Sequence, residues 1–89
     1  MKYDVNYSLI PAHMRHAVEM YVEKGDRPGT FLVAVLENNL AESVARADST
    51  NLNHIIEWAR FLNTEMPATS WGSKEKMEQW IRARKEESK

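Results

Sequence analysis

Residues 30–47 read TFLVAVLENNLAESVARA, and the fold expected for the whole chain depends on this stretch. Apolar side chains recur along it every three or four residues, which indicates a helix with one buried face. This apolar stripe consists of Leu32, Leu36, Leu40, Val44 and Ala47. Residues 31–36 taken alone also fit a strand, because the run is short and partly β-branched. The period continues to residue 47, so we favour a single helix over residues 30–47.

Glycine and proline divide the rest of the chain into further segments with helical periodicity. An N-terminal arm over residues 1–10 precedes the predicted helices, which span residues 11–24, 30–47, 51–66 and 73–85. Pro11 suits the first position of a helix, and Gly25 suits the left-handed cap at its end. The last helix, with Ser73 as its expected cap, has only a narrow apolar seam, formed by Met77, Trp80, Ile81 and Arg84. The sequence therefore predicts one all-α domain over residues 1–89, with three to four helices in a small bundle.

The segment over residues 51–66 is expected to pack against residues 30–47. Its apolar stripe consists of Leu52, Ile55, Ile56, Ala59, Leu62 and Met66. We expect the two stripes to meet in a central antiparallel helix pair. Trp58 and Phe61 then fall at the edge of the core, where exposed aromatic side chains are typical of an interface. These aromatics and the small core that so short a chain provides favour a homo-oligomer.

Composition excludes several classes of protein. The chain has 89 residues, no cysteine and a net charge of −1, so disulfides and thiolate metal sites are ruled out. Binding to DNA or RNA through the phosphate backbone is disfavoured, because there is no basic excess. The longest apolar run, residues 31–36, is far shorter than the roughly 20 residues that a membrane span needs. We therefore expect a cytoplasmic protein with no membrane or nucleic-acid partner.

The histidines are the first candidates for chemistry. His13, His16 and Glu19 share one face of the first predicted helix, and two imidazoles with a carboxylate are ligands for zinc or nickel. The metallopeptidase pattern His-Glu-x-x-His is absent, so we favour a solvated polar face and predict no metal site. His54 and Glu57 have the spacing of a surface hydrogen bond, and no serine lies in a nucleophile motif. The sequence thus predicts neither an enzyme nor a cofactor.

Three residues, Asn39, Arg46 and Trp71, leave both structural and functional interpretations open, and Asp48 has a structural one. Asn39 either fixes the register of a helix pair or faces a ligand. Arg46 either complements the negative end of a helix dipole or binds an anion such as phosphate. Asp48 is a cap candidate for the next helix. Trp71 either covers the junction of the last two helices or stacks on a base.

Five short stretches form a shared pattern: LIPAHMR at residues 9–15, PGTFL at 28–32, AVL at 34–36, RAD at 46–48 and WGS at 71–73. This pattern resembles a family of small phage and prophage proteins. Members of that family read Leu-Pro-x-His-Met-Arg, Pro-Gly-Ser-Phe-Leu-x-Ala-Val-Leu-x-Asn-Asp-Leu, Arg-Ala-Asp and Cys-Trp-Gly-Ser. The resemblance covers residues 9–81. The chain departs from it at Asn39, where members have aspartate, and at Ser70, where members often have cysteine.

The resemblance implies a phage accessory protein in the host cytoplasm that acts by binding. The leading expectation is a host counter-defence protein, which sequesters a small anionic or nucleotide-type immune signal as a homo-oligomer. The alternative is a protein–protein inhibitor or adaptor that binds a host protein through an exposed helix face. Arg15 and Arg46 lie where the resemblance is densest, so the expected ligand-binding residues are Arg15, Asn39, Arg46, Asp48 and Trp71.

Overall fold

A computed structural model describes residues 3–87 of the chain. These residues form six α-helices and one 3-10 turn, and they contain no strand. In chain order the elements are α1 (Ala12–Lys24), α2 (Thr30–Leu36), α3 (Leu40–Arg46), α4 (Ser49–Asn53), α5 (Ile55–Thr64), η1 (Ala68–Ser70) and α6 (Lys74–Glu87). The all-α prediction is confirmed over residues 3–87, but this part of the chain has more helices than the three to four expected.

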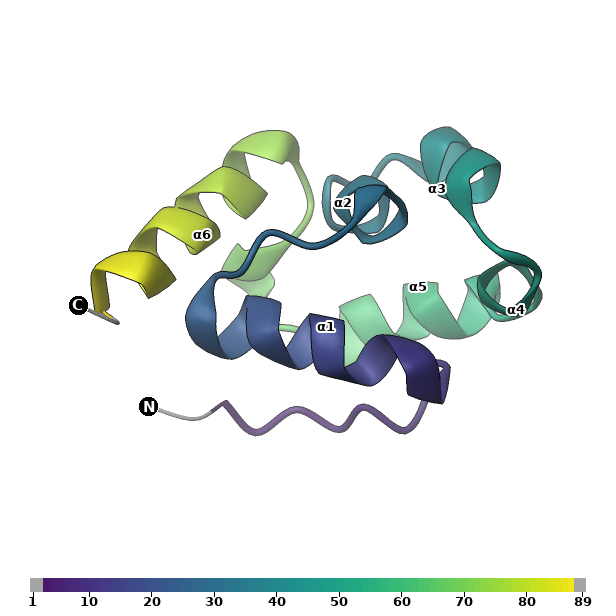
Figure 1. The fold of residues 1–89 in the computed structure, drawn as a ribbon, viewed down its shortest axis with the longest axis horizontal. Helices are drawn as coiled ribbons and strands as arrows, with labels where there is room; N and C mark the ends of the chain where they lie inside the picture. The colour runs from purple at the N-terminus through teal and green to yellow at the C-terminus, as the bar shows by residue number, and fades with distance from the viewer. Residues whose placement is uncertain (1–2, 88–89) are drawn as a thin grey trace.

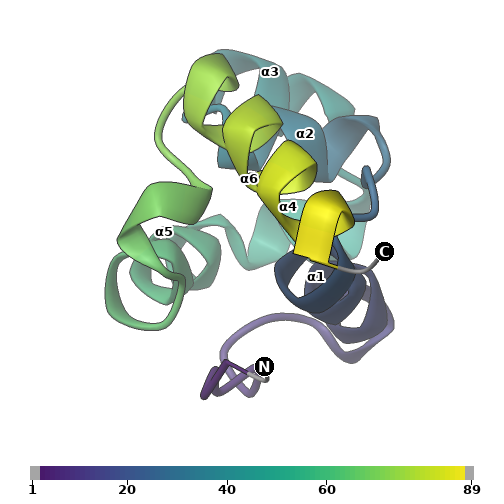
Figure 2. The same cartoon turned by 90° about the vertical axis from the view of Figure 1, so that its left-hand side faces the viewer.

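In Figure 1, α2 lies above α1, with α6 on one side of it and α3 on the other. The C-terminal helix α6 packs against α1 and the turn η1, and α2 packs against α3. Figure 2 shows α6 crossing over α1 while the N-terminal arm runs below α1. Helices α3 and α4 lie at the right-hand side of the molecule in Figure 1, next to the start of α5. This corner is remote from α6.

The predicted helix over residues 30–47 is two helices, α2 and α3. Asn38 has a φ of 64°, in the left-handed region that asparagine tolerates better than other side chains, and this conformation ends α2. The side chain of Asn39 then accepts a hydrogen bond of 3.2 Å from the backbone N–H of Glu42 and caps α3. The single-helix prediction is therefore wrong, because an Asn-Asn pair supplies both a helix end and a helix start.

The predicted helix over residues 51–66 is also divided, at His54. Asp48 caps α4 as expected, because its carboxylate accepts a 2.7 Å hydrogen bond from the backbone N–H of Asn51. Nδ1 of His54 lies 2.8 Å from the backbone oxygen of Thr50, one turn earlier. After His54 the chain starts α5; Asn51 of α4 and Trp58 of α5 are both buried, while Leu52 and Ile56 are both exposed.

The core is built mainly from α1, α2, α5 and α6. Its largest fully buried side chains are aromatic or aliphatic, and they include Trp58, Tyr21, Phe61, Ile10, Leu32, Leu36 and Met77. The Trp58 ring lies edge-on to both Phe31 and Phe61, with centroids 5.5 Å and 6.2 Å away. The expectation that Trp58 and Phe61 lie exposed at the edge of the core is wrong, because their exposed fractions are 1% and 0%.

The seam predicted between residues 30–47 and 51–66 does not form as expected. Leu40 and Ile56, two of its members, are 70% and 68% exposed, and Val44 and Leu52 are also exposed. The central antiparallel helix pair is therefore not confirmed. The core takes the Trp58, Phe61 and Leu62 face of α5 and leaves the face that begins with Ile56 outside.

The two ends of the chain follow the sequence prediction more closely. Gly25 caps α1 in the left-handed conformation, with a φ of 72°. Ser73 accepts a hydrogen bond of 3.1 Å from the backbone N–H of Lys76 at the start of α6. Along α6 the buried side chains are Met77, Trp80, Ile81 and Arg84, which is the predicted narrow seam. Residues 1 and 2 of the predicted arm lie outside the described residues, while Tyr3 packs beside Trp80.

Candidate functional site

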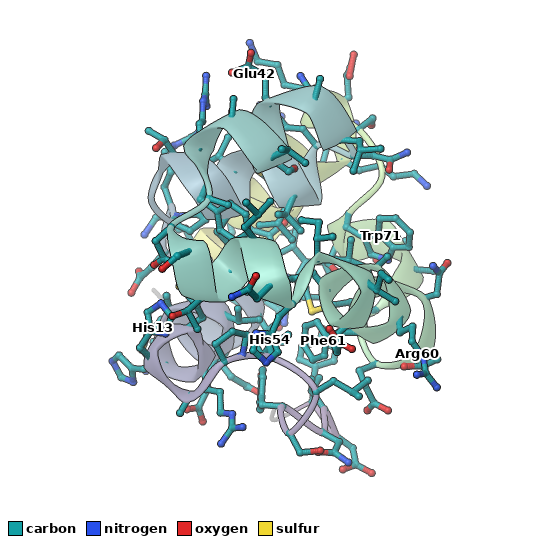
Figure 3. All side chains as sticks on the ribbon, turned by 90° about the vertical axis from the view of Figure 1, so that its right-hand side faces the viewer. His13, Glu42, His54, Arg60, Phe61 and Trp71 are labelled. Atoms are coloured by element: carbon teal, nitrogen blue, oxygen red, sulfur yellow. The ribbon has the colours of Figure 1, made fainter. Side chains whose placement is uncertain are left out.

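The residues expected to bind a ligand do not meet in one place. The guanidinium of Arg15 holds the N-terminal arm, donating a 3.1 Å hydrogen bond to the backbone oxygen of Ile10. Asn39 caps α3, so its amide oxygen is already engaged. Trp71 packs partly buried against the core, and Figure 3 shows it far from His13 of α1. Only Arg46 and Asp48 line a common hollow.

That hollow has a volume of about 260 Å³ and lies where α1, α2 and the end of α3 meet. Arg46 is engaged there: its guanidinium forms a 2.9 Å ion pair with Glu42 and lies 3.4 Å from the backbone oxygen of Thr30. Hydrogen bonds from the backbone N–H of Asn51 and from His13 hold the pKa of Asp48 below its usual value, so this side chain stays negative. One neutralised guanidinium beside one carboxylate offers little attraction to an anionic ligand.

A second hollow, of about 470 Å³, lies between the N-terminal arm and α1. Its lining includes three carboxylates, from Asp4, Glu19 and Glu23, and Glu23 accepts a hydrogen bond of 2.8 Å from the backbone N–H of Tyr3. Burial, and then the charges of Glu19 and Glu23, raise the pKa of Tyr7 to about 12. Because these carboxylates repel negative charge, the hollow is unsuitable for a nucleotide or another phosphate.

The third feature is an apolar groove between α3 and α5. It is lined by Val35, Asn38, Asn39, Leu40, Ser43, Ile55, Trp58, Ala59 and Leu62, and its volume is about 80 Å³. Pockets for drug-sized ligands measure roughly 300–1,000 Å³. A groove this small has room for about one aliphatic side chain and is too small for a drug-sized ligand.

The surface beside this groove is also apolar. The exposed large hydrophobic side chains among residues 3–87 all come from α3, α4 and α5: Leu40, Val44, Leu52 and Ile56. We call these four residues together with the groove the α3–α5 face. Single exposed aliphatic residues are ordinary on protein surfaces, but several on neighbouring elements beside a groove are typical of an interaction site.

The charged side chains of α3 and α5 flank this face without giving it one sign. Glu42 and Arg46 of α3 form an ion pair. Glu57 and Arg60 of α5 contribute one charge of each sign. Since the flanking charges balance, we expect the face to bind mainly through apolar contacts.

The histidines and serines show no catalytic arrangement among the described residues. His13 lies 3.1 Å from Asp48, and both are exposed. Residues 3–87 contain no group of three side chains of His, Asp or Glu placed to hold a metal ion. The hydroxyls of Ser43 and Ser70 donate to nearby backbone oxygens rather than to an imidazole. None of the helices described is both long and apolar enough to cross a membrane.

Comparisons with known proteins add no relative. No protein-family model, curated protein sequence or solved structure matches this chain at a significant level. The resemblance to small phage proteins therefore stays a prediction from the sequence pattern.

The sequence pattern does not predict this face as a site. It predicts Leu40, Val44 and Ile56 in the core, and it predicts Trp58 and Phe61, which are buried, at an interface. One signal was available in the sequence: α5 has apolar side chains on more than one face, at Ile55, Ile56, Trp58, Phe61 and Leu62. A helix needs one apolar face to join a small core, so a second one indicates a further contact.

Proposed function

We propose that this protein is a non-enzymatic binding protein that docks another protein on its α3–α5 face. The observation that carries the proposal is the exposure of Leu40 and Ile56, at 70% and 68%, on two helices that flank one apolar groove. Burying such side chains is favourable by about 25 cal/mol for each Å² of apolar surface removed from water. Among residues 3–87, the exposed large hydrophobic side chains all lie on α3, α4 and α5.

The partner we propose is an amphipathic helix with one protruding aliphatic side chain. Such helices bind by laying their apolar face into a groove and inserting a few anchoring residues. The groove volume of about 80 Å³ fits one anchor, and the exposed Leu40 and Ile56 offer flat apolar contact beside it. The near-neutral surroundings impose no strong charge requirement on the partner.

This proposal favours the second of the two functions expected from the family resemblance. A phage protein of this kind would act in counter-defence as an inhibitor or adaptor that occupies a surface of a host protein. Sequestration of a nucleotide-type signal would have to use the hollow beside Arg46 and Asp48, because the other hollow of sufficient volume is acidic. The ion pair of Arg46 with Glu42 counts against that use.

A comparison of variants in a bacterial lysate tests the proposal. We expect the immobilised chain to retain a partner protein, and Ile56→Asp to reduce that retention at least about tenfold, because a buried charge without a partner is costly at an interface. The matched control is Ala83→Asp, which adds the same charge to the exposed side of α6. The measurement is the amount of each captured protein by quantitative mass spectrometry.

Two results would count against docking on this face. One is equal retention of every captured protein by the wild type and Ile56→Asp. The other is a rise in melting temperature of the wild type with a nucleotide that Arg46→Ala abolishes and Ile56→Asp does not. The second result would establish the hollow beside Arg46 as the binding site instead.

A further inference from the structure

We propose that residues 3–7 form a strap that opens while the helices stay folded, and that the closed strap covers an aromatic surface formed by Phe61 of α5 and Trp80 of α6. The strap runs below α1 in Figure 1, on the opposite side of the molecule from α3. It lies apart from the α3–α5 face, so its opening is a property separate from the proposed function.

The strap is seated on the core as an extended peptide would be. Residues 3–7 form neither helix nor strand, and their exposure alternates along the chain. Tyr3, Val5 and Tyr7 are partly buried against the core, whereas Asp4 and Asn6 are exposed. A period of two is typical of an extended segment that lies with one side on a surface. None of the five side chains is fully buried, so the strap covers the core without being part of its interior.

Two tyrosines of the strap cover the aromatic surface. The ring centroid of Tyr3 lies 5.3 Å from that of Trp80, and the centroid of Tyr7 lies 5.9 Å from that of Phe61. With the strap in place, Trp80 is 7% exposed and Phe61 is 0% exposed. Opening uncovers the sides of both rings that the tyrosines contact. This surface fits an extended segment with aromatic side chains on one side, because the strap itself presents such a segment to it.

Few polar contacts hold the strap closed. The backbone N–H of Tyr3 donates a 2.8 Å hydrogen bond to the carboxylate of Glu23, and that of Asn6 donates a 2.9 Å hydrogen bond to Glu65. Arg84 of α6 adds a cation–π contact, with its guanidinium 5.3 Å from the centroid of the Tyr3 ring. Each such hydrogen bond contributes little net stability, since water replaces it on opening. We therefore expect the strap to open far more easily than the helices unfold.

Two features beneath the strap favour opening. The hollow of about 470 Å³ separates the strap from α1, and Asp4 of the strap shares its lining with Glu19 and Glu23 of α1. No basic side chain among residues 3–87 lines this hollow, so the three carboxylates repel one another across it. The hydroxyl of Tyr7 is buried and has no hydrogen-bond partner among the same residues. Closing the strap thus leaves one polar group unsatisfied, which opening to water relieves.

The chain is fixed directly after the strap. Arg15 of α1 donates hydrogen bonds of 3.4 Å and 3.1 Å to the backbone oxygens of Ser8 and Ile10. Ile10 is 1% exposed, and Pro11 precedes the first residue of α1. The bend on opening therefore falls before Ser8, and the rest of the chain keeps its contacts.

Hydrogen exchange of the full chain, followed by NMR, tests whether the strap opens by itself. We expect the backbone amides of Tyr3 and Asn6 to be at least about 100-fold less protected than those of the buried Val22 and Leu36. Low urea concentrations should speed exchange at the buried residues and leave the strap nearly unchanged, because local opening exposes little surface. Equal protection and equal urea dependence of both sets would overturn the strap, since its amides would then exchange only by global unfolding.

Substitutions in the strap test why it opens, with protection of the Asn6 amide as the readout. We expect Asp4→Asn to raise this protection about twofold and Asp4→Lys about three- to fivefold, because repulsion from α1 is first removed and then reversed. Tyr7→Phe removes the unpartnered hydroxyl and should raise the protection about fivefold or more. The matched control is Glu75→Gln, which removes an exposed carboxylate at the start of α6 and should change nothing. Protection that stays the same or falls in all three strap variants would overturn the proposal.

Discussion

Replacement of Trp58 by alanine is expected to lower the free energy of unfolding by about 3–5 kcal/mol, as is usual for a buried tryptophan. The ring is 1% exposed and lies edge-on to Phe31 and Phe61, so its loss leaves a cavity that these neighbours cannot fill. Its indole N–H also donates a 3.2 Å hydrogen bond to the side chain of Asn51, which is itself buried. Truncation therefore removes packing and leaves a buried amide without its donor.

Urea denaturation followed by circular dichroism measures this loss. Trp58→Phe is the matched variant: it keeps an aromatic ring and removes the indole N–H, so we expect a smaller loss of about 1–3 kcal/mol. If Trp58→Ala cost less than about 1 kcal/mol, in the range of surface substitutions, the ring would not be part of the core. The role of α5 in the fold would then have to be revised.

Replacement of Gly25 by alanine is the second substitution with a large expected effect. Gly25 has a φ of 72°, which costs a residue with a side chain about 1–2 kcal/mol. An added Cβ would also lie 2.7 Å from both the backbone oxygen of Ile81 and the Cβ of Arg84 on α6. Because overpacking of this kind costs about 1–3 kcal/mol more, we expect a total loss of about 2–5 kcal/mol.

Gly29 provides the control for this prediction. A Cβ at Gly29 meets no atom within 4 Å, and its φ of −70° is open to any residue. We therefore expect Gly29→Ala to change the free energy of unfolding by about 1 kcal/mol at most. Equal tolerance of the two substitutions in thermal or urea denaturation would show that α6 does not pack closely over the end of α1.

The ends of α1 and α6 could be predicted because single residues determine them. Pro11 and Gly25 bracket α1, and Ser73 caps α6. Helical spacing also predicts the narrow seam of α6. Arg84 can belong to this seam because its guanidinium covers aromatic rings: it lies 5.0 Å from the ring centroid of Trp80 and 5.3 Å from that of Tyr3. These features are local, so periodicity and capping rules suffice to place them.

The interior of the chain could not be predicted in the same way. An apolar residue at every fourth position fits one long helix as well as two helices joined by a tight turn. The pattern therefore does not reveal the left-handed conformation of Asn38. The apolar side chains of α5 likewise offer two candidate faces, one with Ile56 and one with Trp58 and Phe61. Extending one stripe across residues 51–66 therefore placed Ile56 inside and Trp58 at the edge, the reverse of the observed burial.

The candidate site was missed for the same reason. The polar residues that the sequence pattern suggested as ligand-binding have structural roles. Asn39 and Asp48 cap helices. Arg15 donates a hydrogen bond to the N-terminal arm, and Arg46 forms an ion pair with Glu42. The α3–α5 face exists because α3 ends the apolar stripe of residues 30–47 outside the core. Only the direction of α3 after the turn at Asn38 determines that exposure, and periodicity contains no information on it.

The free energy of unfolding of Leu40→Asp, measured by urea denaturation at a concentration where the chain is monomeric, tests directly whether the α3–α5 face is open. Leu40 is 70% exposed at the first position of α3, so the substitution buries no charge. We expect a change within about 0.5 kcal/mol, as for an ordinary surface site. A loss on the order of 3 kcal/mol or more, as a charge inside a helix seam would cause, would show that the face is closed within the chain and would contradict the proposed binding site.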